Sequence, residues 1–124
     1  MTQGAGESWV VLLQRGEDDA LYEAAAMAAS ATSLGVSVTL VWFDSALEAL
    51  VSDRLEEVGD RRASSPSALL AAARETGRLR SLACSASAVD ATAGVEIVRS
   101  KVDDIVGWPT VISLMRSSTK SFVW

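Results

Sequence analysis

The sequence contains no histidine and only one cysteine, Cys84. Histidine and cysteine are the ligands that most zinc, copper and iron sites in proteins use. The scattered carboxylates that are left suit only weak sites for hard cations. We therefore expect no metal site. A single cysteine also cannot form an internal disulfide, which favours a reducing cytoplasm over export.

Positive charge is scarce as well. The chain has 11 Lys and Arg against 16 Asp and Glu, a net charge of -5, and no basic stripe of the kind that nucleic-acid binding requires. After the first apolar run, QRGEDDA offers a lone glycine followed by acids, so neither a dinucleotide fingerprint nor a phosphate-binding loop is present, and we expect no cofactor. A phospho-acceptor receiver domain needs a lysine after its aspartate. Asp44 follows the second apolar run, but no lysine precedes Lys101, which disfavours that class.

Long apolar segments are missing too. The opening residues MTQGAGESWVVLL have no basic leader, and their apolar run is far below the roughly 18 to 20 residues of a membrane span. Hydrophobic residues make up 49% of the chain and charged residues 22%, which is typical of a soluble globular protein. We expect a cytoplasmic protein without membrane contact, in which residues 1–7 form a flexible lead and residues 8–124 a single domain.

Within that domain, apolar runs alternate with helical patterns. Runs rich in apolar or β-branched residues predict strands over residues 8–14, 36–43, 79–84, 101–106 and 120–124. Helical spacing and helix-forming composition predict helices over residues 20–34, 44–51, 65–77, 85–94 and 109–118. Residues 95–100 fit either a helical turn or an extended connection. Strands joined by helical crossovers are parallel, so the pattern predicts a three-layer α/β/α sandwich with a mainly parallel five-stranded sheet.

Turn and capping residues set the expected boundaries. Asp18 or Asp19 suits the cap of the first helix, and Gly35 suits its carboxyl end. Ser65 followed by Pro66 is typical of a helix start. The charged residues 52–65 predict a surface loop, with a helical turn around residues 55–58.

Cys84 lies where the third predicted strand gives way to a helix. In parallel α/β sheets that end of a strand is where ligands bind, and a following helix can lower the pKa of a thiol through its dipole and unpaired N–H groups. We therefore expect an exposed and reactive thiol. The alternative is that Cys84 only packs, because free cysteine is among the most buried residue types.

Four other residues complete the predicted site. The backbone N–H groups and hydroxyls of Ser85 and Ser87 offer donors to an anion beside Cys84, although Ser87 also suits a helix cap. Gln14 and Arg15 end the first strand and would face the same crevice if that end lies near the third strand. For Arg15 the alternative is an exposed pair with Glu17 or Asp18.

Taken together, the motifs resemble the DsrE/DsrF-like family. The likeness rests on the alanine-rich helix that ends at Gly35, the strand VTLVWF followed by Asp44, the helix that ends in TGRL, the strand that leads to Cys84, and the closing KSFVW. The resemblance implies a five-stranded parallel sheet, assembly into trimers or hexamers, and sulfur transfer between protein partners. It also implies that Cys84 occupies the position of the cysteine that holds a persulfide in sulfur-relay members.

The functional prediction is a sulfurtransferase-like carrier, in which Cys84 accepts sulfane sulfur from a donor protein and passes it to an acceptor. Two alternatives stay open: a non-catalytic module that binds a small molecule or nucleotide at the carboxyl ends of the strands, and an oligomer without chemistry. The apolar terminus 122–124 predicts that a neighbouring subunit covers part of the last strand. The competing possibility is that Trp124 closes the core of its own chain.

Overall fold

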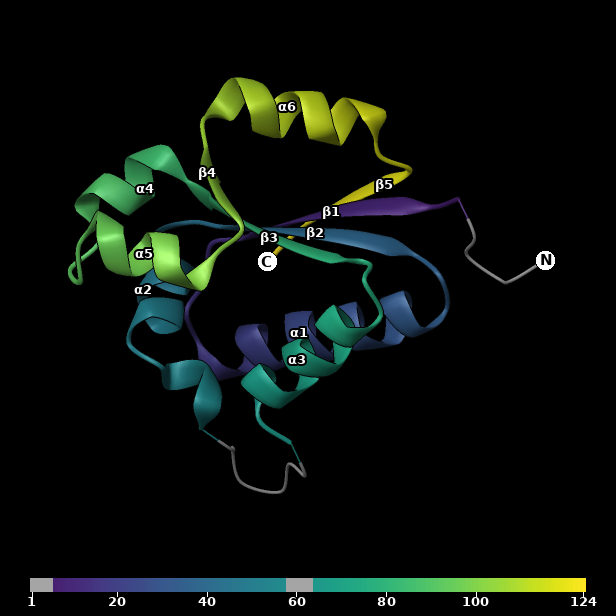
Figure 1. Ribbon diagram of the computed structural model, residues 1–124, viewed down its shortest axis with the longest axis horizontal. Coiled ribbons are helices and arrows are strands. Elements are labelled where there is room, and N and C mark those ends of the chain that lie inside the picture. The colour runs from purple at the N-terminus through teal and green to yellow at the C-terminus, as the bar shows by residue number, and fades with distance from the viewer. Residues whose placement is uncertain (1–5, 58–63) are drawn as a thin grey trace.

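The structure is a computed structural model that describes residues 6–57 and 64–124 (Figure 1). The strands are β1 (Ser8–Leu13), β2 (Ser37–Trp42), β3 (Leu79–Cys84), β4 (Asp104–Val106) and β5 (Lys120–Val123). The α-helices are α1 (Asp18–Ser33), α2 (Asp44–Val51), α3 (Pro66–Glu75), α4 (Ser85–Asp90), α5 (Val95–Lys101) and α6 (Trp108–Ser117), and a short 3-10 helix, η1, covers Arg54–Glu56.

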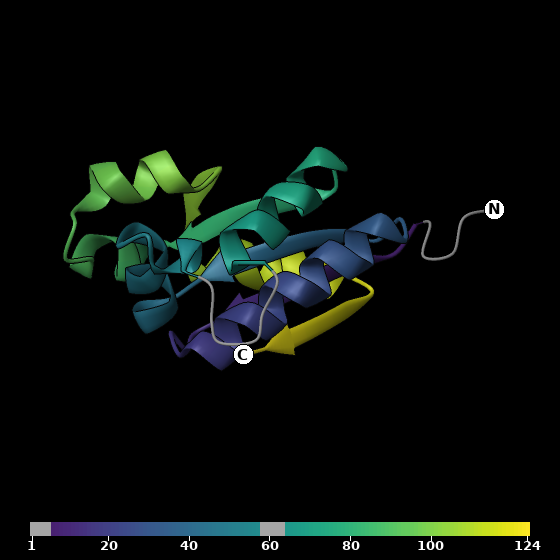
Figure 2. The ribbon, with the colours of Figure 1, turned by 90° about the horizontal axis from the view of Figure 1, so that it is seen from below.

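All five strands are parallel and lie in the order β4-β3-β2-β1-β5. Helices α1 and α3 cover one face of the sheet and α6 covers the other, while α2, α4 and α5 gather at one end (Figures 1 and 2). The predicted three-layer α/β sandwich is therefore confirmed. None of the described helices is long and apolar enough to cross a membrane.

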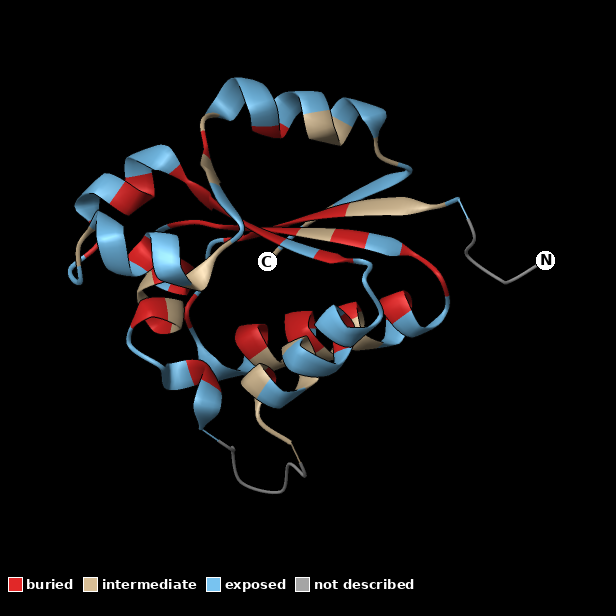
Figure 3. Cartoon of the chain, viewed as in Figure 1, coloured by how far each residue is buried: buried red, intermediate tan, exposed pale blue. Residues whose placement is uncertain are grey.

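Strand alternation divides the core into two layers. On the face of α1 and α3, the core contains Val11, Leu13, Leu40, Trp42 and Ala83 among others. On the face of α6, it contains Val10, Leu12, Val41, Leu82, Cys84, Val106 and Val111 together with Phe43. Figure 3 shows the central strands buried along most of their length and the helices buried on their inner sides. Such burial on both faces explains why these strands are continuous apolar runs.

Two of the predicted caps are confirmed. The Ser65 hydroxyl accepts a hydrogen bond from the Ala68 N–H at 3.1 Å, with Pro66 in the first turn of α3. Gly35 has a φ of 92° just beyond α1, and its N–H donates to the Thr32 carbonyl. Glycine reaches this left-handed conformation at little cost, so it closes the helix where the sequence predicts.

Other boundaries differ from the prediction. The cap of α1 is Glu17, in extended conformation, so Asp18 and Asp19 lie in the first helical turn instead. The predicted helix 85–94 stops at Asp90, because Ala91 is extended, and Gly94 begins α5 rather than ending a helix.

The ambiguous residues 95–100 are helical, and α5 extends through Lys101, so only Asp104–Val106 of the predicted strand 101–106 pairs with β3. The expected turn in the charged loop is the 3-10 helix Arg54–Glu56. Residues 58–63 of that loop and residues 1–5 of the N-terminal lead lie outside the described residues.

Candidate functional site

Cys84 is placed in the chain as predicted, but its side chain is not exposed. It ends β3 and is the cap residue of α4, yet only 4% of it is accessible to solvent. Alternation along β3 turns the thiol toward the face that α6 covers, where it joins the apolar cluster of Leu82 and Val111. The expectation of an exposed thiol is therefore wrong, and the alternative of packing describes this position.

The two serines after Cys84 have different surroundings. Ser87 is buried, and its hydroxyl donates to the Asp44 carboxylate at 3.0 Å while accepting from the Asp44 N–H at 3.1 Å. Asp44 has a φ of 44°, in the left-handed region that non-glycine residues rarely occupy. Ser87 thus holds a strained residue of α2 and is not a helix cap. Ser85 is exposed at the start of α4.

Gln14 and Arg15 do not approach Cys84 as neighbours in the sheet, because β2 lies between β1 and β3. The Gln14 N–H donates to the carbonyl of Trp124 at 2.8 Å, and its own carbonyl accepts from the Ser45 hydroxyl at 2.9 Å. Arg15 pairs with Glu17 at 3.2 Å, and both side chains are mostly exposed. The alternative of an exposed ion pair is therefore confirmed for Arg15.

The Arg15 pair has an electrostatic consequence. The pKa of Glu17 is lowered, first by a hydrogen bond from its own backbone and then by the Arg15 guanidinium. Both interactions favour the charged carboxylate. The Arg15 guanidinium is therefore paired with Glu17.

The loop that follows β1 packs closely against the start of α2. A Cβ on Gly16 would come within 2.4 Å of the Ser45 carbonyl oxygen, so only glycine fits where this loop meets α2. The Gly16 N–H donates to the Ser45 hydroxyl, and the Gly16 carbonyl accepts from Arg54 at 2.8 Å. An open depression remains beside this contact, lined by Gly16, Glu17, Ser45 and Arg54, and Cys84 is not among its lining residues.

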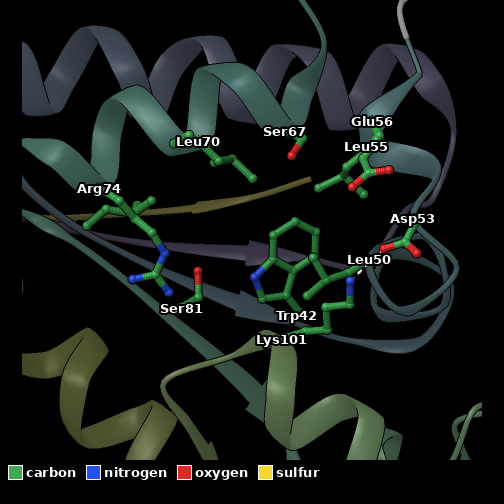
Figure 4. A pocket seen from close by; sticks show the side chains of 12 residues that line it. Trp42, Leu50, Asp53, Leu55, Glu56, Ser67, Leu70, Arg74, Ser81 and Lys101 are labelled. Carbon is green, nitrogen blue, oxygen red and sulfur yellow. Dashed lines mark hydrogen bonds and ion pairs between the residues drawn. The ribbon is translucent and has the colours of Figure 1, made fainter.

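A cavity of about 220 Å³ lies elsewhere, between α3 and the sheet (Figure 4). We call it the α3 pocket. It is bordered by β2, β3, α2, η1, α3 and α5, and its lining residues are Trp42, Leu50, Asp53, Leu55, Glu56, Ser67, Leu70, Ala71, Arg74, Leu79, Ser81 and Lys101.

Trp42 supplies the most informative group in the α3 pocket. Only 2% of the residue is exposed, and its indole nitrogen is the buried side-chain polar atom that finds no hydrogen-bond partner among the described residues. In Figure 4 this nitrogen lies on the side of the ring that faces Ser81 and Arg74. A buried donor without an acceptor costs about 1–3 kcal/mol, so native proteins seldom leave one unpaired.

The two described cations that line the pocket are each paired with a carboxylate. Arg74 donates to Asp103 at 3.1 Å, and the same carboxylate oxygen accepts from the Ser81 N–H at 2.7 Å. Lys101 pairs with Asp53, whose backbone has a left-handed φ of 61°. The first pair links α3 to the segment that follows α5, and the second links α5 to the residue that precedes η1, while the leucines form the apolar walls.

Sequence reasoning missed the α3 pocket because its residues are spread from position 42 to position 101. One signal was present. Trp42 falls inside a buried strand, and a tryptophan there normally needs a partner for its N–H group.

Comparison with known proteins does not identify this chain: no known family model and no curated protein matches it.

Proposed function

We propose that this chain is a binding protein for a small organic molecule, which it holds in the α3 pocket. The observation that carries the proposal is the unpaired and covered Trp42 N–H beside a cavity that has apolar walls and several polar groups, which a ligand reaches by displacing the side chains that cover it. Concave sites with mainly apolar walls and a few placed polar groups are typical of small-molecule binding. The sequence analysis left open a non-catalytic module that binds a small molecule at the carboxyl ends of the strands. The function proposed here is of that kind, but the binding site is the α3 pocket instead.

Ordered water is the competing occupant. A water molecule occupies about 30 Å³ in the liquid, so a cavity of about 220 Å³ has room for several. The Trp42 indole nitrogen is almost fully covered, so water in the open part of the cavity does not pair with it, and water gains nothing from the faces of Leu50, Leu55 and Leu70. A ligand that covers the leucines and accepts from Trp42 uses both features of the pocket.

The experiment follows the Trp42 indole N–H in ¹H–¹⁵N spectra of the full chain. The sequence has 4 tryptophans, so the spectrum contains four indole signals, and Trp42→Phe assigns the one required. A panel of one-ring compounds is titrated to about 10 mM, since ligands of this size typically bind in the millimolar range. At least one compound is expected to shift the Trp42 signal in a saturable manner.

Two matched variants localise the effect. Ser81→Leu fills the pocket from its floor, because Ser81 is buried and lines it. Thr39→Leu makes a comparable change on the opposite face of the sheet, since Thr39 lies between Val38 and Leu40 of the α3-side core. Ser81→Leu should abolish the shift and Thr39→Leu should preserve it. If no compound moves the Trp42 signal, the pocket holds only water and the proposal fails.

The sulfur-carrier function is a second proposal. It is supported by the position of Cys84 at the end of β3, directly before α4, and by the resemblance of the sequence to the DsrE/DsrF-like family. In that reaction the Cys84 thiolate would attack the outer sulfur of a donor persulfide, form a Cys84 persulfide and release the donor thiolate. Because the thiol is 4% exposed beneath α6, this chemistry requires α6 to move first.

A further inference from the structure

We propose that the ligand of the α3 pocket is an uncharged one-ring molecule that carries an amide or lactam group, whose carbonyl oxygen accepts a hydrogen bond from Trp42. This inference rests on the proposed binding function and adds the chemical class of the ligand. Three properties of the pocket support it: the donor that lacks a partner, the balance of charge, and the size.

The donor comes first. An indole N–H only donates, so the group that satisfies Trp42 must carry an acceptor oxygen or nitrogen. A pure hydrocarbon would leave the donor unpaired. A ligand whose polar group is an amidinium or ammonium would do the same, because those groups have no acceptor.

Charge excludes the other obvious acceptor, a carboxylate. Arg74 and Lys101 are already paired, with Asp103 and Asp53 respectively, and Glu56 adds a further carboxylate to the lining. Among the described residues, three acids therefore face two bases around the pocket. An anionic ligand would meet a net negative charge from these described residues and would lose hydration without gaining an unpaired cation among them. A neutral carbonyl avoids that cost.

The second half of an amide also fits. Its N–H group needs an acceptor, and the pocket offers the hydroxyls of Ser67 and Ser81 and the carboxylates of Asp53 and Glu56. A molecule that both accepts and donates therefore matches the polar groups of the site more fully than a simple ketone or ester.

Size limits the apolar part to about one ring. An engineered apolar cavity of about 150 Å³ accepts benzene, so about 220 Å³ has room for one ring and a substituent. The indole of Trp42 and the side chains of Leu50 and Leu70 supply faces against which a flat ring can pack.

The test compares three probes of nearly the same shape: benzamide, benzoate and benzamidine. Each is titrated into the full chain at neutral pH, and dissociation constants are taken from the Trp42 indole signal. Benzamide is expected to bind at least tenfold more tightly than either charged probe and to move the indole proton downfield, as a new hydrogen bond does. In Trp42→Phe, followed through the Leu70 methyl signals, benzamide should lose about tenfold in affinity, which corresponds to about 1.4 kcal/mol.

A Glu56→Gln variant tests the charge argument without touching the core, because Glu56 is exposed. It should raise the affinity for benzoate relative to the affinity for benzamide. Benzoate binding to the wild type as tightly as benzamide would overturn the inference, and tighter binding of benzamidine would do so too. In both cases a probe still occupies the pocket, so the proposed function stands. Failure of all three probes and of the wider panel would reject both proposals.

Discussion

Replacing Ser87 by alanine should destabilise the protein far more than the same change at Ser85. Ser87→Ala removes two hydrogen bonds to Asp44, one of them to its carboxylate, and leaves the Asp44 N–H without its acceptor. A hydrogen bond to a charged group contributes about 1.5–3 kcal/mol, so we expect a loss of about 2 kcal/mol in the free energy of unfolding. For a chain of this length that loss lowers the Tm by about 8 °C.

Ser85→Ala is the matched control, because Ser85 lies in the same helix and is exposed. Its free energy of unfolding should stay within about 0.5 kcal/mol of the wild type. Urea unfolding followed by circular dichroism gives both values. Equal effects of the two substitutions, or no effect of Ser87→Ala, would refute the role assigned to Ser87.

A rescue variant examines the strained backbone of Asp44. Its φ of 44° costs a residue with a side chain about 1–2 kcal/mol, whereas glycine adopts it freely. Adding Asp44→Gly to Ser87→Ala should therefore recover part of the lost stability. Further destabilisation by the second change would show that Asp44 is not strained.

Three other predictions follow from the described contacts. In the folded protein Cys84 should react with iodoacetamide more slowly than a free thiol, and Cys84→Ser should lower stability by about 1–3 kcal/mol, because it places a hydroxyl in an apolar cluster. Rapid labelling would instead favour the sulfur carrier. Arg15→Ala should raise the Glu17 pKa toward its ordinary value in an NMR titration. Because the pKa of Glu17 is lower in the folded than in the unfolded protein, the charged carboxylate stabilises the fold above the unfolded-state pKa, and this stabilisation is lost as the pH falls through the folded-state pKa. The predicted oligomer should appear in sedimentation of the full chain and weaken in Val123→Lys, which changes an exposed side chain of β5; a wild type that stays monomeric would contradict it.

The fold could be predicted because its signals are local. Apolar runs such as VTLVW form strands that are buried on both faces, and Ser65 with Pro66 starts a helix by its own backbone chemistry. The fourth strand is shorter than the predicted strand 101–106 because of a tertiary contact. β4 is an edge strand that pairs only with the end of β3, and the Asp103 N–H donates to the Ser81 carbonyl just before that pairing begins.

The candidate site could not be predicted in the same way. Whether Cys84 is exposed depends on which helix covers its face of the sheet, and α6 is 24 residues further along the chain. The terminal residue shows the same dependence. Trp124 packs partly against the core of its own chain, and its backbone N–H donates to the Leu12 carbonyl at 2.8 Å. That contact agrees with the possibility that Trp124 closes its own core.

The most direct test of the central claim is a crystal structure of the full chain soaked with benzamide, compared with an unsoaked crystal of the same form. The proposal predicts a benzamide molecule in the α3 pocket, with its carbonyl oxygen about 2.7–3.2 Å from Nε1 of Trp42 and its ring against Leu70. A pocket that contains the same ordered waters in both crystals, with one of them bound to the indole nitrogen, would contradict it.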